Sequence, residues 1–123
     1  DAGIMALTNA ADYADSIDID LAACSFVQVP HHGSRHNVSP SVLDRIVGTK
    51  KEKDTEPIKI AFVSVPENST KHPRKVVINA FLRRGAKVIA TQGIIKCDYY
   101  NFPRRPGWST AVPLPFCYQV EGE

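Results

Sequence analysis

Short apolar runs separated by polar segments predict strands along this chain. Residues 23–29 and 58–65 are rich in β-branched and aromatic side chains, which favour buried strands. The second run is apolar at nearly every position after Lys59, a pattern typical of a strand covered on both faces. We therefore expect 58–65 to be a fully buried strand.

The pattern predicts further strands toward the C-terminus. A third run extends from Lys87 to Thr91, and Gln92-Gly93 after it is typical of a two-residue turn. This turn predicts a returning strand at 94–98, and the alternation over 111–120 predicts a last one. A loop rich in proline and arginine, 101–108, separates these two strands.

Three other segments carry apolar residues at helical spacing. Residues 3–14 are rich in alanine and predict a short helix. Ser39-Pro40 starts the second helix, since serine caps helix N-termini and proline suits the first helical position. His72-Pro73 opens the third helix, with Pro73 in the first helical position, and Gly85 ends it. The resulting order, α-β-α-β-α-β-β-β, predicts one layered α/β or α+β domain with helices on a sheet.

Composition narrows the class of protein. The 123 residues fit one compact domain or a piece of a larger one, and 43% apolar with 23% charged residues indicates a folded chain. The net charge of +2 does not by itself imply nucleic-acid binding. Its distribution matters more, because clustered lysine and arginine are typical of solvated faces unless a site lies beside them. The clusters are 50–53, 71–75, 83–84 and 104–105.

The cysteines and the chain start bear on the compartment. Cys24, Cys97 and Cys117 are odd in number and widely spaced, so we expect reduced thiols and favour a cytoplasmic location. No apolar run approaches the ~20 residues that span a bilayer, and no signal peptide opens the chain. Because the first residue is Asp1 rather than Met, we expect a processed product or an excised fragment.

The strongest chemical signal is the stretch Val29-Pro30-His31-His32-Gly33-Ser34. A strand end is a rigid place for ligands, and Gly33 allows the backbone to approach a metal or phosphate closely. Imidazole is the commonest metal ligand in proteins, and a second imidazole beside it can move protons near neutral pH. The alternative is a surface turn with two solvated histidines.

These residues, together with His72-Pro73 and Thr91-Gln92-Gly93, resemble the metallo-β-lactamase-fold domain of ComEC-type DNA-uptake proteins. The resemblance runs from Asp1 to about Asp98 and implies the C-terminal half of an αββα sandwich, in which helices flank two β-sheets. The family's principal metal motif, His-x-His-x-Asp-His, lies upstream of this region and is not in the chain. The resemblance therefore implies a missing N-terminal half as partner, or a second copy that covers the exposed sheet.

The resemblance also implies metal ligands for zinc or manganese in the intact protein. Asp1-Ala2-Gly3 stands where the family has a ligand aspartate, so Asp1 is the expected carboxylate. His32 is the favoured imidazole because Gly33 beside it permits close approach, and His31 is the expected catalytic residue that orients a group or shuttles a proton. The alternatives are an Asp1 that frays and a His31 that caps a turn.

The remaining expected site residues meet the substrate. Catalytic His72 at a helix start would bind a phosphodiester oxygen, because helix N-termini favour anions, with Lys71 and Arg74 alongside. Ser34 would contact substrate or a metal-bound water, and Thr91 would hydrogen-bond near the site. The alternatives are helix capping by His72 and ordinary turn or strand-end hydrogen bonds for the two hydroxyls.

Three functions remain open at this point. The first is a metal-dependent phosphodiesterase or nuclease that acts on nucleic acid. The second is a non-catalytic module of the same fold that binds through its cleft and basic loops. The third is a hydrolase of a small phosphoester or a lactam-like ester. An upstream His-x-His-x-Asp-His motif would favour an enzyme over a binding module.

Overall fold

The computed structural model describes residues 2–99 and 101–122. Its helices are α1 (Ile4–Ser16), α2 (Pro40–Ile46) and α3 (Lys75–Leu82), and its strands are β1 (Phe26–Gln28), β2 (Lys59–Val63) and β3 (Ala86–Ala90). Short 3₁₀ turns are η1 (Leu21–Ala23), η2 (Pro30–Gly33) and η3 (Arg35–Asn37). The chain is thus a small α/β domain.

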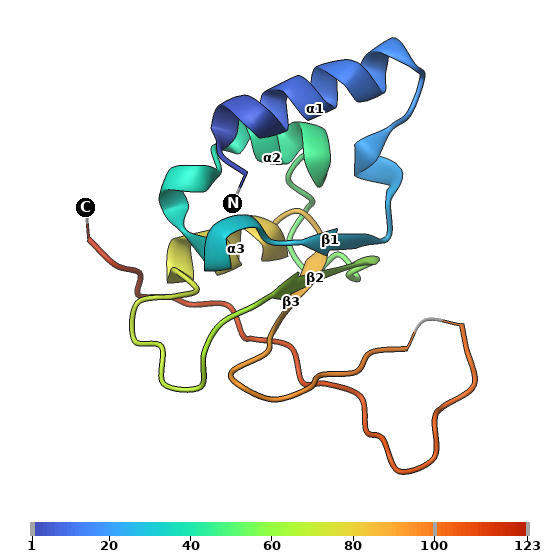
Figure 1. Cartoon of the computed structure of the whole chain (residues 1–123), viewed down its shortest axis with the longest axis vertical. Helices are drawn as coiled ribbons and strands as arrows, with labels where there is room; N and C mark the ends of the chain where they lie inside the picture. Colours follow the sequence, from blue (N-terminus) through green and yellow to red (C-terminus); the bar gives the residue numbers. More distant parts are fainter. Residues whose placement is uncertain (1, 100, 123) are drawn as a thin grey trace.

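The strands form one parallel three-stranded sheet with β2 in the centre. Parallel neighbours require long crossovers, and these contain α2 between β1 and β2, and α3 between β2 and β3. In register, Phe26 lies opposite Ile60, and Ile60 lies opposite Lys87. The carboxyl ends of all three strands therefore meet at one edge of the sheet, where the predicted site residues follow β1 and β3 (Figure 1).

One face of the sheet forms the core with the helices. Ala61 and Val63 of β2 are fully buried and belong to a cluster that includes Phe81 of α3. The intervening residues Ile60 and Phe62 are partly exposed on the other face. The prediction of a strand buried on both faces was therefore wrong for β2, because the helices cover only one of them.

The two predicted C-terminal strands, 94–98 and 111–120, are wrong. Neither range contains strand structure, although the turn at Gln92-Gly93 is confirmed, with positive φ at both residues. The C-terminal segment lies along β3 instead, where Leu114 N–H donates to the carbonyl oxygen of Val88 at 2.8 Å. Prolines at 113 and 115 flank Leu114 and have no N–H, so a continuous ladder cannot form there.

The third helix begins later than the sequence predicts. Ser39 caps α2 and Pro40 is its first residue, as expected, but α3 begins at Lys75 rather than at Pro73. Arg74 precedes α3 in an extended conformation, and its N–H donates to the carbonyl oxygen of Gly33 at 3.1 Å. This bond fixes the segment before the helix against the turn after β1.

The described residues include free thiols at Cys24, Cys97 and Cys117. Among those same residues, no helix has both the length and the apolar character needed to cross a bilayer.

A buried arginine joins α2 to α3. The Arg84 side chain is 2% exposed, and its Nε and Nη2 donate to the Asp44 Oδ1 at 3.0 and 2.8 Å. The guanidinium also donates to the carbonyl oxygens of Ala80 and Pro40. A buried guanidinium that is this fully bonded keeps the two helices in fixed register.

Asp44→Ala should lower the free energy of unfolding substantially, because it leaves the Arg84 guanidinium buried without its carboxylate. We expect a loss of roughly 2–4 kcal/mol, toward the low end for buried pairs since the Asp44 side chain is half exposed. Urea unfolding measures it. Asp15→Ala is the matched control, because its pair with Arg45 lies at the surface and is screened by water. Equal losses in the two variants would contradict the structural role of Arg84.

Candidate functional site

The site depends on a close approach between two segments that are distant in sequence. Gly33, at the end of η2, has a φ of +80°, and a Cβ built on it would lie 2.7 Å from the Pro73 Cβ. Real Cβ atoms do not approach that closely, so only glycine fits here. The sequence predicted that Gly33 lets a metal or phosphate approach, whereas in the structure it lets Pro73 approach.

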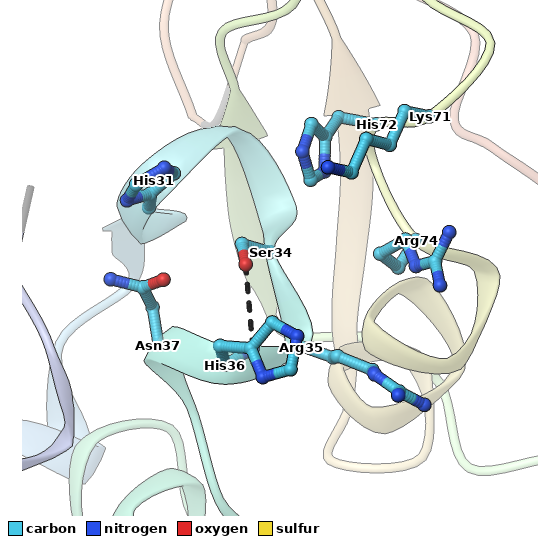
Figure 2. A pocket seen from close by; sticks show the side chains of 8 residues that line it. All are labelled: His31, Ser34, Arg35, His36, Asn37, Lys71, His72 and Arg74. Atoms are coloured by element: carbon cyan, nitrogen blue, oxygen red, sulfur yellow. Dashed lines mark hydrogen bonds between the residues drawn. The ribbon is translucent and has the colours of Figure 1, made fainter. Parts of the chain in front are cut away.

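This contact creates a cavity of about 290 Å³ beside the sheet edge. Figure 2 shows the residues that follow β1 on one side of it and those that precede α3 on the other. The lining residues are His31, Ser34, Arg35, His36, Asn37, Lys71, His72 and Arg74. They comprise cations, histidines and neutral polar groups, with no carboxylate among them, so the cavity has the electrostatics of an anion site. We call it the cationic cavity.

His72 is the most unusual group in the cavity. Its Nδ1 is buried and has no hydrogen-bond partner among the described residues. Burial lowers the pKa of His72 below its usual value of 6.5, and the positive charges of Lys71 and Arg74 lower it further. His72 is therefore neutral at pH 7 and has an unused polar atom, a combination typical of functional histidines.

The predicted position of His72 at a helix N-terminus is wrong. The first N–H groups of α3 are already bonded, because Lys75 N–H donates to both carboxylate oxygens of Glu121, at 2.8 and 3.0 Å. Burial acts to raise the pKa of Glu121, but these backbone hydrogen bonds and the nearby Arg74 lower it overall. The cavity therefore attracts anions through its side chains and not through the dipole of α3.

His31 and His32 form a backbone turn of uncommon geometry. Both have positive φ, 45° and 55°, in a region that non-glycine residues rarely adopt and that costs about 1 kcal/mol per residue. Their rings lie edge to face with centroids 5.9 Å apart. Strain of this kind is concentrated at functional sites, and here the turn directs two imidazoles toward the sheet edge.

His32 has one ring nitrogen fixed by the backbone. Its Nδ1 lies 2.6 Å from the carbonyl oxygen of Ser64, which follows β2. A carbonyl only accepts, so Nδ1 carries a proton, and in the neutral form of the ring the lone pair lies on Nε2. This is the tautomer that metal-bound histidines have when a carbonyl orients them, and it suits His32 as a ligand through Nε2.

The described residues do not form a complete metal site. Within 2–99 and 101–122, no three histidine, cysteine, aspartate or glutamate side chains are grouped to hold an ion. The predicted ligand Asp1 lies outside the described residues. Its neighbour Ala2 lines a hollow together with His31 and His32, and the Ala2 carbonyl oxygen accepts a hydrogen bond from Asn37 Nδ2 at 3.0 Å.

The described residues among those predicted line three hollows, since His31 and His32 also share the one beside Ala2. His31, Ser34, Lys71, His72 and Arg74 line the cationic cavity. His32 and Thr91 line a separate hollow at the same sheet edge. The Thr91 hydroxyl donates to the carbonyl oxygen of Val65 and accepts from its N–H, both at 3.0 Å, so it joins the ends of β2 and β3. Thr91 therefore does not face Lys71 and Arg74.

Three cavity residues escaped the sequence analysis. Arg35, His36 and Asn37 form η3, and no site role was predicted for them. Ser34 caps this turn, since its Oγ accepts the His36 N–H at 3.3 Å. A signal for these residues is present in the sequence, because no apolar side chain occurs between His32 and Val38.

No protein-family model matches the chain, and no curated protein or solved structure is significantly similar to it.

Gly33→Ala should destabilise the domain by roughly 2–4 kcal/mol, since it combines an unfavourable φ with a steric clash against Pro73. Gly107→Ala is the matched control, because Gly107 has the same φ of +80° with no atom within 4 Å of its Cβ position. Thermal unfolding of the two variants isolates the clash. Similar losses in both would mean that the Gly33–Pro73 contact is not tight.

The pKa of His72 should lie below 6.5 and should rise in Lys71→Gln, because that change removes a nearby positive charge. Since the folded pKa is lower than the unfolded one, His72 favours folding above about pH 6.5, and this contribution is lost as the pH falls through the folded pKa. Titration of the imidazole proton signals by NMR measures the value. Arg104→Gln, in the exposed loop, should leave it unchanged.

Proposed function

We propose that this chain is part of a metal-dependent hydrolase of phosphodiester bonds, and that the cationic cavity binds the phosphodiester group. The observation that carries the proposal is the cavity itself. Arg35, Lys71 and Arg74 meet there without any lining carboxylate, beside the buried and unbonded Nδ1 of His72. A phosphodiester is a compact anion with several acceptor oxygens, and it matches this set of donors.

The side chains have distinct roles in this proposal. Arg74 and Lys71 bind the non-bridging oxygens, Arg74 through two parallel N–H groups and Lys71 as a point charge. His72 is neutral at pH 7, so it exchanges a proton with a substrate oxygen in a pH range where most lysines cannot. His31, at the opposite rim, orients the substrate or relays a proton.

The metal part of the proposal needs further ligands. His32 contributes Nε2, and Asp1 is the proposed carboxylate partner; the described residues alone do not complete a site for zinc or manganese. The remaining ligands would come from the other half of an αββα sandwich.

We further propose that this other half covers the open face of the sheet. Phe26 is 55% exposed there, and its ring packs against Phe62 of β2 with centroids 5.5 Å apart. Alternating apolar residues opposite the helix-covered face are typical of a sheet that packs against a second layer.

A second function is favoured by one observation. Because the described residues contain no three-ligand cluster, a module that binds a phosphodiester without cleaving it fits the same cavity. Hydrolysis by the full-length protein separates the two functions.

In the full-length protein, His32→Ala should abolish hydrolysis of bis(p-nitrophenyl) phosphate and lower the bound metal content. His72→Ala should retain metal and lose turnover by roughly 10²–10³-fold, the effect of removing one transition-state donor. Metal analysis and the hydrolysis rate are measured on the same samples, with Arg104→Gln as control. Full activity in both histidine variants would refute the proposal, and phosphate binding without hydrolysis in the wild type would favour the binding module.

A further inference from the structure

Two grooves continue from the cationic cavity along the surface of α2 and α3. Arg35 lines both the cavity and a groove between these helices. Lys50 and Arg83 line that groove and also the next one, beside the 49–57 connector. The three depressions therefore follow one another, and each junction is marked by a basic side chain. We call this path the basic track.

Three basic side chains of the track are available to a ligand, whereas Arg84, which also lines the groove between α2 and α3, is buried on Asp44. Arg35, Lys50 and Arg83 form no ion pair with any carboxylate within 2–99 and 101–122. The acids beside the track are Glu52 and Asp54, which line the last groove together with Lys51 and Lys53. Cations thus outnumber carboxylates along its whole length, and the track complements an extended anion rather than a single phosphate.

The backbone fixes where these charges lie. Lys51 N–H donates to the carbonyl oxygen of Arg83 at 2.8 Å, which attaches the connector to the end of α3. Lys50 and Arg83 are therefore kept together although 33 positions separate them in the sequence. Val38 and Ala80 line the groove between them and Arg35.

An aromatic pair stands at the far end of the track. Phe116 and Tyr118 line the last groove, and their rings lie edge to face at 5.3 Å. Buried Asn79 positions them, because its amide donates to the Cys117 carbonyl oxygen and accepts the Cys117 N–H, at 2.7 and 2.8 Å. The guanidinium of Arg83 lies 5.3 Å from the Phe116 ring centre, whereas Tyr118 is 93% exposed.

We propose that the basic track binds single-stranded nucleic acid, with phosphates on Arg35, Lys50 and Arg83 and a base stacked on Tyr118. Polynucleotides combine regularly spaced negative charge with flat bases, and proteins that bind single strands pair a cationic groove with exposed aromatic rings. An acidic peptide would use the charges but would gain little from Tyr118. This inference rests on the proposed function for its substrate, since the strand leads into the cavity where cleavage is proposed.

The test is binding of a fluorescent oligothymidine of about 16 nucleotides to the 123-residue chain, measured by anisotropy over a range of salt concentrations. Lys50→Gln/Arg83→Gln should weaken binding and reduce the salt slope by about 1.4, or 0.7 for each phosphate that is no longer neutralised. Lys87→Gln/Arg104→Gln removes the same charge elsewhere and should keep the wild-type slope. Equal slopes in the two double variants would overturn the proposal.

Stacking is tested by a second set of variants. Tyr118→Ala should raise the Kd by about 5- to 150-fold, while Tyr118→Phe keeps it near the wild-type value. Tyr13→Ala, on α1, removes another exposed ring as control. Poly-glutamate or phosphatidylserine vesicles that bind as tightly as the oligonucleotide, without dependence on Tyr118, would overturn the choice of nucleic acid.

These readouts are independent of hydrolysis. Lys50→Gln/Arg83→Gln and Tyr118→Ala variants of the full-length protein should hydrolyse bis(p-nitrophenyl) phosphate at the wild-type rate, because this small substrate reaches only the cavity. Track-dependent oligonucleotide binding without any hydrolysis would refute the proposed enzyme and leave the track established. Hydrolysis without track-dependent binding would refute the basic track as a binding site and support the proposed enzyme.

Discussion

The contact between Gly33 and Pro73 is the constraint on which the rest of this structure depends. It brings the turn after β1 against the segment before α3, and the hydrogen bond from Arg74 N–H to the Gly33 carbonyl oxygen fixes the two backbones together. His31 lies on one side of the resulting cavity, and His72 and Arg74 lie on the other (Figure 2). A larger side chain at position 33 would separate those sides, so the local conformation of one glycine determines whether a cavity exists.

The parallel sheet explains why chemistry gathers at one edge. Each strand runs in the same direction, so the segments after β1, β2 and β3 leave the sheet together. Hydrogen bonds between these segments then fix their geometry: His32 contacts the Ser64 carbonyl oxygen, and Thr91 bonds to the backbone of Val65. Binding groups of open parallel sheets typically lie at this edge for the same reason. The covered face of the sheet, by contrast, contributes only packing.

Local sequence signals predicted the features that local forces determine. The Ser39 cap and the turn at Gln92-Gly93 depend on neighbours along the chain, and both are present. The start of α3 was mispredicted because Arg74 is extended and its N–H bonds to the carbonyl oxygen of Gly33, which is distant in sequence. The site was predictable to the same extent: its histidines and cations were identified by residue type, and the structure brings most of them to one cavity. Their grouping with Arg35 depends on the tertiary contact at Gly33, which leaves no periodic signal in the sequence.

The distribution of paired and unpaired cations separates structural roles from binding roles. Arg84 is buried on Asp44, and Arg45 bonds to Asp12 and Asp15, so these arginines are satisfied within the fold. Arg35, Lys50 and Arg83 of the basic track form no such pair with the described carboxylates, although they lie within the same small domain. Gathering unpaired cations raises the electrostatic energy of the folded state, and an anionic ligand lowers it again. The same arrangement that makes the cavity and track costly without a ligand therefore favours an anion there, as the proposed phosphodiester binding requires.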